Sequence, residues 1–247
     1  GAPGAPQSAL AVPVAPPAAH PLGRLTVFGA TGGTGLVLVQ LALERGYRVR
    51  AFVRSPAVLA RELGDLVRHP ALEITPGDLG DSHAVEAAAE GADAVISVAG
   101  AKPETAPGPM APAIPAIVGG CRRHRVRRLV VQACALAAAP GERVGWLTQG
   151  SLVRTVVRWQ LGSSVVDDNE RVLAFLKDVR DVAWVASRPA GLVDGDARGG
   201  LAACADDFRT GTVRYADVAE WTLAQVDSDA YVYTMPRLYY PPVRHPL

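Results

Sequence analysis

A glycine-rich turn near the start of the chain has the residue types and spacing of a phosphate-binding loop. Its sequence is Gly29-Ala30-Thr31-Gly32-Gly33-Thr34-Gly35, and it follows an apolar run, Leu25–Phe28, that reads as a strand. Gly29 permits a tight turn, Gly32 lets a pyrophosphate approach the backbone, and Gly35 lets the next helix pack close to the strand. Because the N–H groups at the start of that helix would face the anion, the turn predicts a dinucleotide site.

Arg54 and Ser55 indicate which dinucleotide binds. They follow the second predicted strand, Tyr47–Val53, where a carboxylate would accept hydrogen bonds from the ribose hydroxyls of NAD. A guanidinium can instead pair with a 2′-phosphate, and a serine hydroxyl can add a donor. The alternative is an ordinary solvated arginine. Placed after the glycine turn, Arg54 favours NADP(H) as the cofactor.

Predicted helices and strands alternate along the rest of the chain. Helices are expected at Leu36–Leu43, Pro56–Leu66, Asp81–Glu90, Ala111–Arg123, Asp167–Val179 and Asp217–Val226, with further strands at Leu72–Thr75, Ala94–Val98, Arg128–Ala133, Val182–Ser187 and Tyr231–Thr234. This alternation predicts an α/β protein with a single, doubly wound parallel sheet of Rossmann type. In such sheets ligands bind at the carboxyl ends of the strands.

The composition fits one soluble domain. The chain has 247 residues, of which 49% are hydrophobic and 20% charged. We expect residues 24–247 to form an NADP-binding domain, and residues 1–23, which are rich in Ala and Pro and hold no Lys, Arg, Asp or Glu, to be a flexible tail. A net charge of +1 predicts neither a nucleic-acid nor a membrane partner. The three cysteines and five histidines lack disulfide or metal-ligand spacing, so no metal is expected and a cytoplasmic location fits.

Five motifs occur in an order and at spacings shared with a known family. They are the glycine turn, Val53-Arg54-Ser55, Gly77-Asp78-Leu79, Arg188-Pro189-Ala190-Gly191-Leu192 and Arg214-Tyr215-Ala216-Asp217-Val218-Ala219. Over residues 24–236 the chain resembles the atypical short-chain dehydrogenase/reductases. Within them it is most similar to the branch of NmrA-like proteins and biliverdin reductase B, a flavin reductase.

The resemblance implies a cofactor-binding role for each matching residue. Thr31, Gly32 and Thr34 would meet the pyrophosphate, Arg54 with Ser55 the 2′-phosphate, and Asp78 with Leu79 the adenine. The remaining positions would border the ribose (Ala99, Gly100) and the nicotinamide (Cys134, Pro189, Ala190, Gly191, Leu192).

The chain departs from the alcohol-oxidising members of the larger family. Those enzymes use a Tyr-x-x-x-Lys pair, in which the lysine lowers the pKa of the tyrosine so that it can transfer a proton. This chain has only two lysines, Lys102 and Lys177, and neither has a tyrosine four residues before it. The dyad is therefore absent.

The expected positions of the dyad hold weak proton-transfer groups. Counted back from Glu170, the tyrosine and lysine places fall at Ser163 and Asp167, while Ala135, just after Cys134, stands where the family's serine would be. The catalytic residues thus remain unknown. The absence of a strong proton donor at these positions favours an acceptor that needs no protein acid, such as a quinone, an aromatic polyketide or a flavin. Hydride addition to such an acceptor gives a delocalised anion.

Two segments beyond the strand ends are expected to contact the substrate. Residues 136–166 carry Trp146 and Trp159, and residues 191–213 carry Leu192, Leu201 and Phe208. Aromatic and aliphatic side chains in such loops can form the wall of a site for a small aromatic substrate, although each is more often core.

Several other residues have a structural interpretation that outweighs a catalytic one. Cys134 ends an apolar strand and is expected to be a small buried hydrophobe, not a nucleophile. Asp167, Asp168 and Asp217 precede apolar runs and are expected to cap helices. The basic run Arg122–Arg128 is expected to lie at the C-terminus of a helix, where positive charges interact favourably with the helix dipole, and not to bind nucleic acid.

Two functions remain open from the sequence. The first is an NADPH-dependent reductase of a planar aromatic acceptor, for example a quinone reductase in antibiotic biosynthesis or other bacterial natural-product metabolism. The abundance of Arg, Ala, Gly and Pro, with only two Lys, resembles proteins of high-GC bacteria. The second is a redox-inactive, NADP-sensing regulator of the NmrA-like kind that binds a protein partner.

Overall fold

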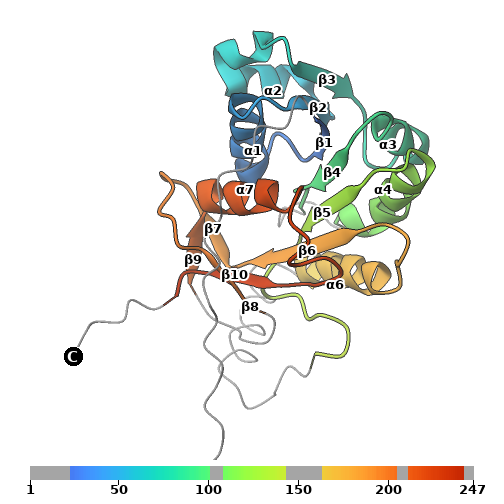
Figure 1. Ribbon diagram of the computed structural model, residues 1–247, viewed down its shortest axis with the longest axis vertical. Helices are drawn as coiled ribbons and strands as arrows, with labels where there is room; N and C mark the ends of the chain where they lie inside the picture. The colour runs from blue at the N-terminus through green and yellow to red at the C-terminus, as the bar shows by residue number, and fades with distance from the viewer. Residues whose placement is uncertain (1–22, 101–107, 143–162, 205–210, 242–247) are drawn as a thin grey trace, which may run out of the picture.

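Eight strands form one central sheet in the computed structural model, which describes residues 23–100, 108–142, 163–204 and 211–241 (Figure 1). The strand order is β3-β2-β1-β4-β5-β6-β10-β8, and a separate two-stranded sheet pairs β7 with β9. All pairs are parallel except β10 with β8, which are antiparallel at the edge. The predicted doubly wound α/β sheet is confirmed, with one antiparallel edge strand added.

The order along the sheet reverses direction between β1 (Arg24–Phe28) and β4 (Ala94–Ser97). On one side lie β2 (Arg48–Val53) and β3 (Leu72–Pro76). The strands on the other side, with the small sheet, are β5 (Arg128–Gln132), β6 (Trp184–Pro189), β7 (Gly191–Val193), β8 (Ala202–Cys204), β9 (Thr212–Arg214) and β10 (Arg237–Tyr239).

Helices cover both faces of the sheet. The helices on one face are α1 (Gly33–Glu44), α2 (Pro56–Leu63) and α7 (Tyr215–Ala224), and those on the other are α3 (Ser82–Ala88), α4 (Met110–Arg123) and α6 (Ser163–Lys177). A short 3₁₀ turn, η1 (Gly64–Arg68), follows α2. None of the helices in the described ranges is long and apolar enough to cross a membrane.

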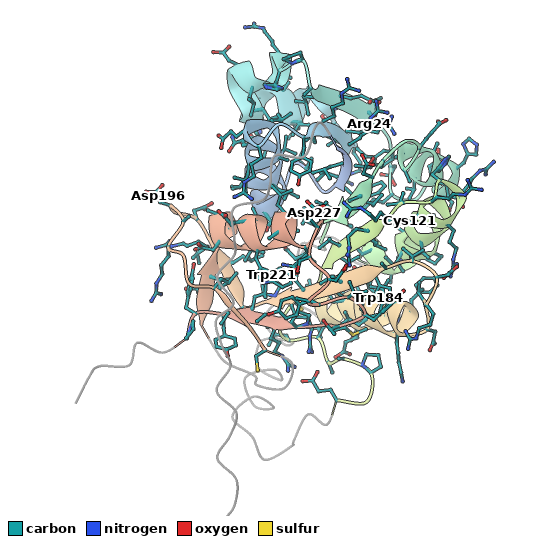
Figure 2. All side chains as sticks on the ribbon, in the orientation of Figure 1. Arg24, Cys121, Trp184, Asp196, Trp221 and Asp227 are labelled. Atoms are coloured by element: carbon teal, nitrogen blue, oxygen red, sulfur yellow. The ribbon has the colours of Figure 1, made fainter. Side chains whose placement is uncertain are left out.

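Each face of the sheet has its own apolar core, because successive side chains of a strand point to opposite faces. In β1, Val27 packs with α1 and α7, whereas Phe28 packs with α3 and α4. Figure 2 labels one tryptophan from each core. Trp221 of α7 belongs to the core on the α1 and α7 face, and Trp184, at the start of β6, belongs to the core on the α6 face. The rigid double layer holds the carboxyl ends of β1, β4, β5 and β6 at one edge.

Four predicted elements are displaced in the structure, and one of them is the helix expected at Asp217–Val226, which is found at Tyr215–Ala224. The helix expected from Asp167 begins at Ser163, so neither Asp167 nor Asp168 is its N-cap. The sixth strand is Trp184–Pro189, two residues later than predicted. The last strand is Arg237–Tyr239 and not Tyr231–Thr234, because the chain turns at Tyr233, whose φ of 60° is incompatible with a strand.

Candidate cofactor and substrate site

The glycine turn lies where the strand order reverses, the usual position of a ligand crevice in an open α/β sheet. Phe28, the last residue of β1, pairs with Ser97 of β4, and the N–H of Val98 donates to the carbonyl of Phe28 at 3.0 Å. The turn after β1 therefore runs directly beside Ala99. The structure thus brings two predicted site segments, the glycine turn and Ala99-Gly100, together.

The three key glycines of the turn differ in what surrounds them. Gly29 has a φ of +86°, and a Cβ there would lie 2.4 Å from the backbone N of Ala99. A Cβ on Gly35 would lie 2.1 Å from the carbonyl oxygen of Gly29. A Cβ on Gly32 would meet only that same oxygen, at 3.4 Å. Packing therefore requires glycine at 29 and 35, whereas position 32 is open and exposed to a ligand.

The start of α1 has the unpaired polar groups that a phosphate would satisfy. Gly32 is the N-cap and supplies no side chain, and the first turn of α1 has no acidic residue. Thr34 is 3% exposed, and within the described residues its Oγ1 has no hydrogen-bond partner. An orphaned hydroxyl, free N–H groups and an open Gly32 fit the pyrophosphate of a dinucleotide.

Tyr215 lies beside the glycine turn, and the two together are called the cradle below. The motif that contains Tyr215 did not reveal this role. A Cβ on Gly33 would lie 2.6 Å from Cζ of Tyr215, so the phenol ring lies directly over Gly33. Tyr215 begins α7, which packs along α1. The ring forms one wall of the glycine turn, and Gly33 is required for it to fit.

The predicted 2′-phosphate and adenine residues lie at the ends of β2 and β3. Arg54 follows β2, is exposed and makes no ion pair within the described residues, so its guanidinium is available to an anion. Ser55 is the N-cap of α2 and makes no side-chain capping bond there. The N–H of Gly77 donates to the carbonyl of Val53 at 2.9 Å, which places the segment Asp78-Leu79 beside Arg54.

Asp78 and Leu79 form the outer part of this end of the site. The carboxylate of Asp78 accepts a hydrogen bond from the N–H of Gly80 at 2.7 Å and is otherwise exposed. Leu79 packs against the core on the α3 side. Asp78 is therefore held in a fixed position at the surface, as a contact to a base or ribose requires.

The residues predicted to border the nicotinamide are brought together at the ends of β5 and β6. The N–H of Ala135 donates to the carbonyl of Pro189 at 2.9 Å, which joins the segment of Cys134 to that of Pro189-Ala190-Gly191-Leu192. Burial raises the pKa of the Cys134 thiol, so the thiol stays protonated. Cys134 is half-buried and not fully buried as expected, but its raised pKa agrees with the expectation that it is not a nucleophile.

A second residue missed from the sequence, Gln132, ends β5 next to this segment. Its Oε1 is buried and has no hydrogen-bond partner within the described ranges. Gln132 is on the same face of β5 as Val130, which packs toward α1 and α7. It is thus a candidate acceptor for a hydroxyl or amide group bound at this edge.

A buried charge cluster holds the loop that follows β5. Arg188 of β6 is 1% exposed; its guanidinium donates to the carbonyl of Ala137 at 3.0 Å and to Glu142 at 2.7 Å. Arg237 of β10 donates to the carbonyl of Ala135 at 3.1 Å and also pairs with Glu142. Burial raises the pKa of Glu142, but the N–H of Ala139 and the two guanidinium groups together lower it below its ordinary value.

The aspartates predicted to cap their own helices have other partners. Asp168 lies inside α6, and its carboxylate accepts the N–H groups of Met110 and Ala111 at 3.2 and 2.7 Å, so it caps α4. Asp217 lies in the first turn of α7 and accepts the N–H groups of Arg198 and Gly199, which fixes the loop after β7. The prediction that each caps its own helix is wrong, because both carboxylates bind groups distant in the sequence.

The basic run begins in the last turn of α4, as predicted, and three of its arginines also form ion pairs that the sequence did not predict. Arg122 pairs with Asp181 at 2.6 Å and Arg127 with Asp227 at 2.6 Å, and Arg128 with Asp229 at 2.5 Å. These contacts tie the helix end and β5 to neighbouring loops.

Parts of the expected substrate segments lie outside the described residues. Trp146, Trp159 and Phe208 are among them, so their predicted role remains a prediction. Leu192 and Leu201 are described and pack against the core on the α7 side. Ser163 begins α6, and Asp167 lies one turn later in the same helix.

Comparison with known proteins identifies the family. Residues 29–229 match the family described as NAD(P)H-binding, and this match covers most of the chain. The chain belongs to that family. The predicted NAD(P)-binding family and NAD(P)H cofactor are confirmed by this match, in agreement with the expected resemblance to the atypical short-chain dehydrogenase/reductase, NmrA-like group.

Two solved structures share the fold. ChuY, an anaerobillin reductase from Escherichia coli O157:H7, is 21% identical, with a TM-score of 0.70 over 90% of this chain and 100% of that chain. A short-chain dehydrogenase/reductase from Veillonella parvula in complex with NADP is 16% identical, with a TM-score of 0.69 over 90% of this chain and 97% of that chain. The chain therefore has the fold of NAD(P)-dependent oxidoreductases.

A curated relative matches a smaller part of the chain. The 3 beta-hydroxysteroid dehydrogenase/Delta 5-->4-isomerase of Mycobacterium tuberculosis is 38% identical over 78 residues, which is 32% of this chain. The aligned part is 19% of that protein's length.

Proposed function

We propose that the protein is an NADPH-dependent reductase that transfers a hydride to a planar aromatic acceptor such as a quinone, an aromatic polyketide or a flavin. One observation carries this proposal. The segments that leave the carboxyl ends of β4, β5 and β6 are 98–100, 133–139 and 189–193, and they consist only of Ala, Gly, Val, Leu, Pro and Cys134. Among the described residues, these segments thus give the edge where the acceptor would bind an apolar lining without an acidic side chain.

An apolar edge suits one kind of acceptor. Reduction of a simple ketone concentrates negative charge on one oxygen, which requires a proton donor or an oxyanion hole. A quinone or flavin spreads that charge over its rings and takes its proton from solvent. NADP(H), when bound, supplies the hydride. The protein's part is then to bind both rings, to stack them and to exclude water.

The residues at the other end of the crevice favour the phosphorylated cofactor. Arg54 is exposed and free of ion pairs within the described chain, and Ser55 adds a hydroxyl beside it. We infer that this pair binds the 2′-phosphate and selects NADPH over NADH. Thr31, Gly32 and Thr34 hold the pyrophosphate in the same proposal.

The names of the relatives support a polycyclic acceptor. ChuY is an anaerobillin reductase, and the mycobacterial relative is a hydroxysteroid dehydrogenase. Both names refer to oxidoreductases of large molecules that contain several rings. An apolar edge of Ala, Gly, Leu and Pro residues could receive such a ring system.

The test is NADPH oxidation with a panel of quinones, flavins, aromatic polyketides and aliphatic ketones. We expect the planar acceptors to be reduced and the aliphatic ketones not to be. Cys134→Ala and Asp167→Ala should each lower kcat less than about tenfold, because a general acid or base typically supplies roughly 10²–10⁴-fold. A loss of about a thousandfold in a folded variant would assign the proton transfer to that residue and contradict the proposal.

The same assay distinguishes the regulator alternative. If NADPH binds tightly and no acceptor is reduced, an NADP-sensing role with a protein partner replaces the reductase proposal. Calorimetry of NADPH binding, measured in parallel, separates this outcome from failure of the cradle itself.

A further inference from the structure

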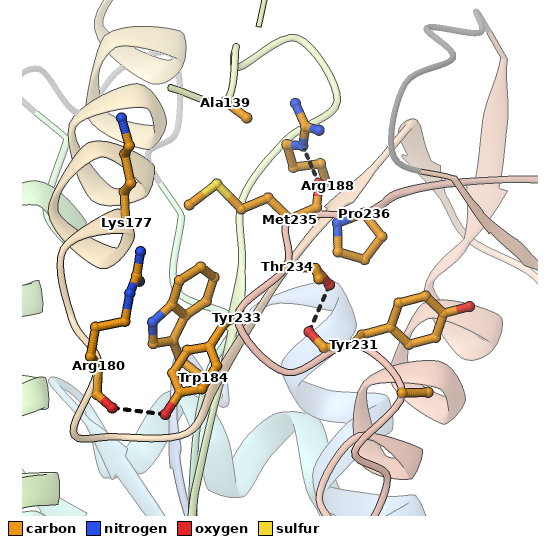
Figure 3. Close-up of a pocket in the computed structure, with 11 residues that line it drawn as sticks. Ala139, Lys177, Arg180, Trp184, Arg188, Tyr231, Tyr233, Thr234, Met235 and Pro236 are labelled. Atoms are coloured by element: carbon orange, nitrogen blue, oxygen red, sulfur yellow. Dashed lines mark hydrogen bonds between the residues drawn. The ribbon is translucent and has the colours of Figure 1, made fainter. Parts of the chain in front are cut away.

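A second cavity, of about 490 Å³, opens on the α6 face of the sheet, between the end of α6, strand β6 and the segment that precedes β10 (Figure 3). Its volume is within the range of small-molecule sites, roughly 300–1,000 Å³. The proposed reductase function does not use it.

The cavity extends along β6 from Arg188 to Trp184, away from the cofactor edge, and of the segments that form the apolar edge only Ala139 contributes to its lining. Trp184, the first residue of β6, lines it and pairs with Leu129 near the start of β5. The cradle and the apolar edge lie at the carboxyl ends of the same strands. With about 3.3 Å per residue, the six residues of β6 span roughly 20 Å.

The cavity has a rigid aromatic floor. The rings of Trp184 and Tyr233 meet edge to face with centroids 5.8 Å apart, and the indole N–H of Trp184 donates to the carbonyl of Val179 at 3.0 Å. Met235 and Pro236 continue the apolar surface. Trp184 is only 1% exposed and its ring is nearly perpendicular to that of Tyr233, at 81°, so the ring of Tyr233, which is 42% exposed, is the aromatic surface that a ligand ring would meet.

Tyr233 is held in an unusual conformation to complete this floor. Its φ of 60° is rare for a bulky residue, and it is 42% exposed. Its N–H donates to the carbonyl of Trp184 at 2.7 Å, and its hydroxyl donates to the carbonyl of Arg180 at 2.9 Å. A strained backbone stabilised by surrounding contacts is typical of functional positions.

Two cations stand on one wall without a counter-ion. Figure 3 shows Lys177 and Arg180 on the same side of the cavity; Lys177 is the last residue of α6, and Arg180 lies in the segment that follows it. Within the described residues neither pairs with a carboxylate, and no acidic residue lines the cavity. Arg180 also lies over the Tyr233 ring, 5.9 Å from its centroid. The third cation, Arg188, is already paired with Glu142.

We propose that this cavity is a second ligand site, which takes a planar aromatic anion such as an aromatic carboxylate or sulfonate. The ring lies on Tyr233 beside Met235, with Trp184 supporting Tyr233 from below, and the anionic group pairs with Lys177 and Arg180. The site is separate from the cofactor cradle, so both can be filled at once.

The experiment measures the binding of two probes with the same rings to the full chain, first without NADPH and then with saturating NADPH. The anionic probe is anilinonaphthalene sulfonate and the neutral probe is N-phenylnaphthylamine, both followed by fluorescence. The test variant is Lys177→Gln/Arg180→Gln. The matched control, Arg61→Gln/Arg68→Gln, removes the same charge from side chains that are 74% and 83% exposed near α2 and η1. Circular dichroism and NADPH affinity verify that each variant is folded.

The Lys177/Arg180 variant should bind the anionic probe at least about tenfold more weakly, the effect of losing one or more charge-assisted hydrogen bonds. The control variant should change the affinity for the anionic probe less than about twofold, as is usual for distant surface charges. The neutral probe should not respond to either variant. Tyr233→Ala should weaken the binding of both probes.

Three results would overturn the proposal. They are an anionic probe that binds the test variant normally, an equal loss in the control, and displacement of the probe by NADPH, which would place it in the cradle.

Discussion

Gly32→Val separates the glycine that faces the ligand from those required by packing. Gly32 has φ −83° and ψ 165°, which any residue adopts, and a Cβ there meets only one atom, at 3.4 Å. The matched variant is Gly35→Ala, whose Cβ would lie 2.1 Å from the carbonyl oxygen of Gly29. The two glycines are three residues apart in the same turn. The change at Gly32 should mainly weaken NADPH binding, whereas the change at Gly35 should mainly lower the stability of the free protein.

The magnitudes follow from these contacts. Valine is a poorer N-cap than glycine by about 1 kcal/mol, and this loss is partly offset by about 0.4–1 kcal/mol from the more restricted unfolded chain. Gly32→Val should therefore change the free energy of unfolding by no more than about 1 kcal/mol. Loss of two charged hydrogen bonds to phosphate, about 1.5–3 kcal/mol each, weakens NADPH binding by at least about 150-fold.

Gly35→Ala should instead destabilise the free protein, by about 1–3 kcal/mol or more, because a backbone oxygen cannot move aside. Urea denaturation without cofactor and calorimetric titration with NADPH measure the two effects. A Gly32→Val protein that is folded and binds NADPH within about threefold of the wild type, well short of the loss worked out above, would show that the cradle is misplaced.

Three further predictions concern the charged residues. Arg54→Gln should weaken NADPH binding about tenfold or more and leave NADH binding unchanged in calorimetry; equal losses would refute the 2′-phosphate contact. Glu142→Gln leaves the buried Arg188 without its counter-ion and should lower the free energy of unfolding by about 3 kcal/mol. Asp168→Ala should cost about 3 kcal/mol or more in urea denaturation, since two charge-assisted bonds to α4 are lost, while NADPH affinity stays unchanged.

The Glu142 cluster also predicts a pH dependence. Because the pKa of Glu142 is lowered in the folded protein, its stabilisation is complete above the pKa of an unfolded glutamate and is lost as the pH falls through the folded value. The wild type should lose more stability than Glu142→Gln on acidification through that window. Parallel losses in both proteins would contradict this role.

The glycine turn and the doubly wound class of the sheet could be predicted because the first depends on local sequence and the second on the alternation of helices and buried strands along the chain. Strand, turn and helix adjoin in the chain at 25–44, and the apolar runs identify the buried strands. Asp81 was likewise placed correctly, since its carboxylate accepts the N–H of Ala84 three residues later.

What the sequence could not show depends on contacts between distant residues. Tyr215 reaches Gly33 from the other end of the chain, and Asp168 caps a helix that begins at Met110. The pairing of Glu142 with Arg188 and Arg237 is equally non-local. A helix-start pattern cannot tell a carboxylate that caps its own helix from one that caps a neighbour.

The most direct test of the central claim is the rate of NADPH oxidation with a planar quinone, compared with an aliphatic ketone of similar solubility. We expect turnover of the quinone and no turnover of the ketone. Cys134→Ala should change kcat less than about tenfold, which is below the effect of losing a general acid or base. Turnover of the ketone alone, or a loss of about a thousandfold in the folded Cys134→Ala protein, would contradict hydride transfer at an edge without a protein acid.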